Sequence, residues 1–187
     1  MQNLSFNPAL ALPFALFTAT AAILYGVIVS FRVVSLDAGN LKMRKIADAI
    51  AEGASAYLSR QYLTIAPVAV FIFAVIWFLI SLETAVGFLV GAVASAAAGF
   101  IGMNISTRAN VRTAQAAVSG LKNALSVAFA GGSVTGFLVV GLALLSVAGY
   151  FGATGSIEGL IGLGFGGSLI SVFARLGGGI YTKGAEI

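Results

Sequence analysis

Three charged side chains close to the C-terminal end of the sequence could act on a single bound group. Arg175, Lys183 and Glu186 lie within and after a long uncharged stretch. On an α-helix, Arg175 and Glu186 would lie within about 20° of each other and about 16 Å apart along the axis. Lys183 would lie about one turn from Glu186, so the two could address the same ligand. Arg175 would lie deeper, where a charge is usually paired or functional. The alternative interpretation is an ordinary positively charged helix end.

The residue types that the sequence lacks narrow the chemistry further. The 187 residues include no cysteine and no histidine, which excludes thiolate and imidazole metal sites and Cys or His nucleophiles. Carboxylates, lysine, arginine and hydroxyl groups remain. Hydrophobic residues make up 59% of the chain and charged residues 9%, against about 25% charged residues in an average globular protein. This composition excludes an ordinary water-soluble fold.

Long uncharged stretches must position these side chains, and they predict membrane-spanning helices. A helix needs roughly 20 apolar residues to cross a hydrocarbon core of about 30 Å. The last uncharged stretch, residues 159–174, has only 16 residues, so its helix must continue past Arg175 through the glycines at 177–179. We predict an all-α, polytopic membrane protein that is part of a larger helical bundle. Its five transmembrane helices are expected at approximately residues 10–31, 62–82, 85–106, 124–150 and 160–182.

The lysine and arginine residues predict the orientation of these helices. All ten fall on one side of the predicted spans, whereas the other side carries only Glu83 and Glu158. By the positive-inside rule, the N-terminus is expected outside and the C-terminus in the cytoplasm of a multi-pass protein of the plasma (inner) membrane. The asymmetry also explains the pI near 9.7 without a nucleic-acid partner. The ten cations are Arg32, Lys42, Arg44, Lys45, Arg60, Arg108, Arg112, Lys122, Arg175 and Lys183.

The segment 41–60 between the first two spans has its own helical pattern. Met43, Ile46, Ile50, Ala54 and Tyr57 recur at helical spacing among charged residues. We expect an amphipathic cytoplasmic helix that runs into the second span. It could cover a cytoplasmic site or rest on lipid headgroups.

A repeat of small residues in the third span predicts close helix packing. Gly87, Gly91, Ser95 and Gly99 recur every four residues and form a groove along one face. In lipid, such a groove lets another helix approach closely. We therefore expect a tightly packed bundle.

Four stretches of the sequence resemble the membrane-bound, ion-pumping pyrophosphatases. The most specific is SLISVFARLGGGIYTKGAEI at residues 168–187, which is similar to the end of the fifth transmembrane helix in that family. It is supported by EGASAYLSRQY at 52–62, NISTRANVRTAQAA at 104–117 and AFAGGSVTGFLVVGLALL at 128–145. Members of the family are several times longer. Residues 1–187 thus resemble the N-terminal membrane segment of a larger single-domain pump.

The resemblance implies a function and roles for individual residues. Such a pump is a homodimer that uses Mg²⁺ as cofactor and couples the hydrolysis of pyrophosphate to outward movement of protons. Sodium ions are the alternative cargo. By resemblance, Lys183 contacts pyrophosphate, Glu186 binds the metal at a position where the family usually has aspartate, and Arg175 belongs to the network that couples hydrolysis to ion movement. The dependence on K⁺ is decided by residues outside this sequence.

The resemblance also places no catalytic residue within these 187 residues. The carboxylates that activate the attacking water in the family lie in later helices, so the chain alone is expected neither to hydrolyse pyrophosphate nor to pump. The rival hypothesis is a complete small helical membrane protein without enzymatic activity, acting as a scaffold, channel or transporter subunit.

Overall fold

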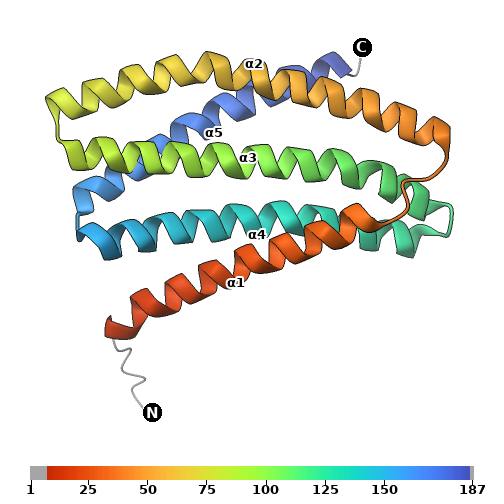
Figure 1. Cartoon of the computed structure of the whole chain (residues 1–187), viewed down its shortest axis with the longest axis horizontal. Helices are drawn as coiled ribbons and strands as arrows, with labels where there is room; N and C mark the ends of the chain where they lie inside the picture. Colours follow the sequence, from red (N-terminus) through yellow and green to blue (C-terminus); the bar gives the residue numbers. More distant parts are fainter. Residues whose placement is uncertain (1–7, 186–187) are drawn as a thin grey trace.

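The computed structural model describes residues 8–185, with side chains over residues 10–179, and this part of the chain is built of five α-helices. The prediction of an all-α protein with five long apolar helices is confirmed (Figure 1). The helices are α1 (Pro8–Ser35), α2 (Leu41–Leu79), α3 (Leu82–Ala117), α4 (Leu121–Thr154) and α5 (Ile157–Ala185).

Each helix is long and apolar enough to cross a membrane, as expected of a multi-pass membrane protein. The shortest, α1, has 28 residues, and the longest, α2, has 39. At a rise of about 1.5 Å per residue, α2 is about 58 Å long, roughly twice the thickness of a hydrocarbon core. The longer helices therefore continue beyond the apolar part of a bilayer. Leu41–Leu79 is unbroken, so residues 41–60 belong to the same helix as the second apolar stretch.

Short connections with local caps join the helices. Asn40 caps α2 by accepting a hydrogen bond from the Met43 amide at 3.0 Å, and Ser81 caps α3 by accepting one from the Thr84 amide at 3.1 Å. Gly155 ends α4 in the left-handed conformation, with φ of 65°. Because the connections are short, consecutive helices run in opposite directions; α2 and α3, and α3 and α4, lie side by side, whereas α1 and α2 lie on opposite sides of the bundle (Figure 1).

Helix α3 is the centre of the bundle. It packs against α2, α4 and most extensively α5, whereas α1 packs mainly on α4 (Figure 1). One core cluster joins α1, α3 and α4, and two others join α3 to α2 and α5. Their buried members are Val29, Val33, Ala109, Val134 and Leu138 in the first, Ile65, Ala92 and Ile170 in the second, and Ile76, Ala85 and Phe88 in the third.

Glycines on both α3 and α5 let these two helices meet at their backbones. A Cβ atom on Gly87 would overlap the carbonyl oxygen of Gly159, and one on Gly91 would overlap that of Leu163. Two α5 glycines are packed in the same way, Gly162 against the carbonyl of Thr84 and Gly166 against that of Phe88. We call the α3–α5 contact formed by Gly87, Gly91, Gly162 and Gly166 the glycine seam.

The glycine seam confirms the predicted close approach for the first half of the small-residue repeat. Gly99 meets a different neighbour, because its missing side chain faces the hydroxyl group of Tyr62 on α2. Ser95 lines a groove beside α4. Backbone contact of this kind is a main source of helix association in lipid, where apolar side chains gain little from one another.

Candidate functional site

Arg175 lies on α5, which continues through it to Ala185, as the short last uncharged stretch required. Its side chain is exposed on the helix surface. Among the described residues, no acidic side chain forms an ion pair with it. A guanidinium inside a membrane span is usually paired or functional.

A shallow cavity of about 340 Å³ borders Arg175. Ser168 and Ser171 contribute hydroxyl groups to it, and Val172 and Leu176 form its apolar wall. Every lining residue belongs to α5, so the cavity is a hollow on the outer surface of this helix rather than a closed site. It can be completed only by groups from another element.

Tyr57 links α2 to α5 one residue before Arg175. Its hydroxyl group donates a hydrogen bond of 3.4 Å to the carbonyl oxygen of Ala174. The same hydroxyl lies where a side chain on Gly177 would point, since a Cβ atom there would be 2.5 Å from it. Helix α2 thereby sets the position of α5 at the level of the predicted coupling residue.

Lys183 lies in the final turns of α5, but its side chain is outside the described part of the chain, and Glu186 is outside the described residues altogether. Along a helix, Lys183 stands about 12 Å beyond Arg175. The predicted convergence of Lys183 and Glu186 on one bound group stays a prediction.

Small residues of α3, α4 and α5 line a second cavity, an apolar groove of about 490 Å³. Gly91, Ser95 and Gly99 of α3 form one wall. Ser168 and Ser171 line both this groove and the hollow at Arg175, so the two cavities meet along α5. The groove contains hydroxyl groups but no charged side chain.

The described carboxylates form no cluster that could hold a metal ion by themselves. Magnesium demands an octahedral set of oxygen ligands. Over residues 8–185, no three acidic side chains gather closely enough to hold a metal ion. Glu83 and Glu158 lie at the first turns of α3 and α5, far along the sequence from the predicted site. At that site the chain would offer Glu186 alone.

Inter-helix hydrogen bonds from tyrosines were not anticipated from the sequence. Besides Tyr57, the hydroxyl of Tyr62 donates to the carbonyl of Ala96 at 2.8 Å, and that of Tyr150 donates to the carbonyl of Glu83 at 2.7 Å. A tyrosine within an apolar span needs an acceptor for its hydroxyl group, so its presence in the sequence could have predicted an inter-helix hydrogen bond. The signal does not identify the acceptor.

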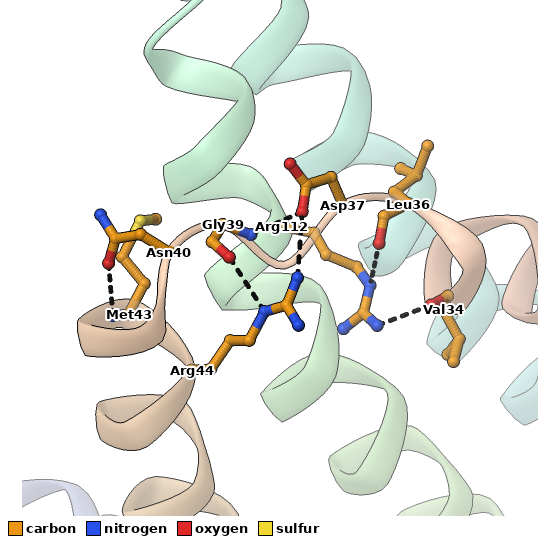
Figure 2. A network of polar contacts seen from close by, with 8 residues as sticks. All are labelled: Val34, Leu36, Asp37, Gly39, Asn40, Met43, Arg44 and Arg112. Atoms are coloured by element: carbon orange, nitrogen blue, oxygen red, sulfur yellow. Dashed lines mark hydrogen bonds and ion pairs between the residues drawn. The ribbon is translucent and has the colours of Figure 1, made fainter.

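Two arginines that the sequence marked only as topological charges organise the connection between α1 and α2 (Figure 2). Arg112 donates from Nε to the carbonyl of Leu36 at 3.0 Å and from Nη2 to the carbonyl of Val34 at 2.6 Å. Arg44 donates from Nε to the carbonyl of Gly39 at 2.9 Å and lies 3.5 Å from Asp37 Oδ1. Arg112 thus satisfies carbonyls at the end of α1 that have no partner within the helix.

The chain is similar in sequence to one family of membrane proteins. The family model described as "Inorganic H+ pyrophosphatase" matches residues 20–187. The chain is 50% identical to the K(+)-insensitive pyrophosphate-energized proton pump of Methanosarcina mazei, over 100% of this chain and 27% of that protein. It is 44% identical to K(+)-insensitive pyrophosphate-energized proton pump 2 of Moorella thermoacetica, over 89% of this chain and 26% of that protein.

A third relative differs in its named cargo. The putative K(+)-stimulated pyrophosphate-energized sodium pump of Clostridium tetani is 38% identical, over 93% of this chain and 26% of that protein. The chain therefore spans about a quarter of the length of the curated relatives that it matches.

Proposed function

Because the chain belongs to the inorganic H⁺ pyrophosphatase family, we propose that it forms the N-terminal part of a membrane pump that couples pyrophosphate hydrolysis to outward translocation of protons. The observation that carries this proposal is the 50% identity over the whole chain to a relative named as a pyrophosphate-energized proton pump. The five apolar helices support it, since a pump of ions must be embedded in the membrane.

The C-terminal cluster on α5 supplies the residues of this chain that act in the pump. Lys183 binds pyrophosphate, because an ammonium group neutralises phosphate charge as a compact point charge. Arg175 couples hydrolysis to ion movement, because a guanidinium within the membrane pairs with a carboxylate that the transported ion also meets. Its exposed position and the absence of an acidic partner among the described residues support such a pairing with a later helix.

Magnesium is the proposed cofactor of the complete pump, where it would neutralise charge on pyrophosphate. This chain would contribute Glu186 and no other carboxylate at that place. The remaining ligands and the groups that activate water would come from the rest of the protein. By itself, the chain is accordingly proposed to be inactive.

Protons are the proposed cargo, and turnover is proposed to be independent of K⁺. Two relatives with 50% and 44% identity are named K(+)-insensitive proton pumps, whereas the relative named as a sodium pump is 38% identical. The pump is further proposed to be a homodimer in the plasma membrane, with the N-terminus outside. The collection of all ten cations on one side of the spans supports this orientation.

Membrane vesicles containing the complete gene product test the proposal. Phosphate release from pyrophosphate and acidification of inverted vesicles are expected together, with equal rates in the presence and absence of K⁺. Lys183→Ala is expected to weaken pyrophosphate binding by at least about tenfold, the scale of one hydrogen bond to a charged group. Lys122→Ala is the matched control, because Lys122 is an exposed cation at the start of α4. Absence of pyrophosphatase activity in the complete protein would overturn the proposal.

A further inference from the structure

A separate cavity of about 450 Å³ lies where the end of α1, the start of α2 and the end of α3 meet. No residue of α5 lines it, so it is distinct from the hollow at Arg175. Its volume falls within the range of about 300–1,000 Å³ that is usual for small-molecule sites. The charged and polar lining residues are Arg44, Asp48, Thr107, Arg108 and Arg112.

Positive charge exceeds negative charge around this cavity. Three guanidinium groups line it, against the single carboxylate of Asp48. Asp37 lies outside the lining and pairs with Arg44, at 3.5 Å. Arg108 has no acidic partner among residues 8–185. Both Arg44 and Arg108 lie close enough to Arg112 for their charges to repel it.

The hydrogen bonds of the lining residues indicate which groups are available to a ligand. Arg112 already donates to the carbonyls of Leu36 and Val34 (Figure 2) and to that of Arg108, so it is held in place by the protein. The Thr107 hydroxyl donates within its own helix, to the carbonyls of Met103 and Asn104. The guanidinium of Arg108 and the part of Arg44 that does not contact Gly39 or Asp37 remain as donors.

The chemistry of the donors and the walls points to a phosphate group as the ligand. Guanidinium forks match the oxygen geometry of phosphate. Apolar side chains, among them Val34 and Val111, complete the lining and could contact the carbon skeleton attached to a phosphate ester. The cavity lies among candidate membrane-spanning helices, at the end that also carries Arg32, Lys42, Lys45 and Lys122, and anionic headgroups attract such basic residues.

We propose that this cavity binds a phosphate group through Arg108 and Arg44, carried either by an anionic lipid headgroup or by free phosphate. The bound anion offsets the repulsion of Arg112 by Arg44 and Arg108 and joins α2 to α3. This inference does not depend on the pump function.

Native mass spectrometry of the complete gene product in mild detergent tests the proposal. The probes are dioctanoyl phosphatidylglycerol, dioctanoyl phosphatidylcholine and, in parallel calorimetry, inorganic phosphate. We expect retention of phosphatidylglycerol over phosphatidylcholine, and a loss of at least about tenfold in Arg108→Gln, the scale of a charge-assisted hydrogen bond. Binding of inorganic phosphate that is lost in Arg108→Gln, without preference between the lipids, would identify free phosphate as the ligand.

Two further variants separate this site from general charge attraction. Arg32→Gln is the matched control, because Arg32 is an exposed arginine in the last turn of α1 and does not line the cavity. Asp48→Asn is expected to strengthen binding, because it removes the carboxylate from the lining. The proposal is overturned if folded Arg108→Gln, with an unchanged unfolding temperature, binds phosphatidylglycerol and inorganic phosphate like the wild type. Equal losses in Arg32→Gln and Arg108→Gln would overturn it as well.

Discussion

Tyr57 and Ala174 are 117 positions apart in the sequence and are joined by a hydrogen bond of 3.4 Å from the tyrosine hydroxyl to the alanine carbonyl. Arg175, the predicted coupling residue, is the next residue of α5. The missing side chain of Gly177 leaves room for the same hydroxyl group. A tyrosine on α2 and a glycine on α5 therefore set the distance between these helices at the candidate site.

This relationship predicts non-additive effects of two substitutions. Tyr57→Phe should lower the free energy of unfolding by about 0.5 kcal/mol, because the bond is long. Gly177→Ala should cost about 1 kcal/mol or more, because the new Cβ atom meets the Tyr57 hydroxyl at 2.5 Å. The double variant should be more stable than the sum of the two losses, since removing the hydroxyl relieves the clash. Thermal unfolding in detergent measures this, and strict additivity would contradict it.

The glycine seam predicts strong destabilisation by a single added side chain. Gly91→Val places methyl groups on the Leu163 carbonyl and should cost about 1–3 kcal/mol or prevent α5 from packing. Gly164→Ala is the control on α5, because nothing lies within 4 Å of its Cβ position. That variant should gain roughly 0.5–1 kcal/mol from helix propensity. Similar unfolding temperatures for the two variants would show that the helices do not meet at their backbones.

Replacement of Arg112 is expected to loosen the connection between α1 and α2. Arg112→Gln removes donors from the carbonyls of Leu36 and Val34, which are then left to solvent. Hydrogen exchange should accelerate over residues 33–40, with a loss of about 1–3 kcal/mol in local stability. Arg60→Gln, an exposed arginine farther along α2, serves as the control. Unchanged exchange in Arg112→Gln would argue against the contact.

Replacement of Arg175 is expected to separate pyrophosphate hydrolysis from proton transport in the proposed pump. Arg175→Ala should reduce the protons moved per pyrophosphate hydrolysed while hydrolysis continues, because the side chain is about 12 Å from Lys183 along the helix. Vesicle acidification and phosphate release, measured on the same preparation, give this ratio. A normal ratio with Arg175→Ala would assign the residue a structural role.

The five helices could be predicted from the sequence because charged residues interrupt the apolar stretches, but their ends could not. Helix α3 continues to Ala117, past the predicted end at residue 106, since charged residues end a membrane span without ending a helix. The repeat of Gly87 and Gly91 predicted a close neighbour but not that the neighbour is α5. The partner depends on where α5 places Gly162 and Gly166, which no local pattern specifies.

Residues of the candidate site could be predicted from the sequence only where the residue type itself is unusual for its surroundings. Arg175 stood out as a cation inside an apolar helix. The structural role of Arg112 requires carbonyls that lie 76 and 78 positions away, at the end of a different helix. Such a contact depends on the packing of α1 beside α3, and the count of positive charges contains no information about it.

The glycine seam also limits how the candidate site can move. From Gly159 to Gly167, α5 meets the α3 backbone too closely to rotate or slide without collision. Beyond Gly167, helix α5 continues for about five turns, through Arg175 to Ala185, and its described contact with α2 is through Tyr57. The first half of α5 is therefore held against the α3 backbone, whereas the second half, which carries Arg175, is held to α2 at Tyr57.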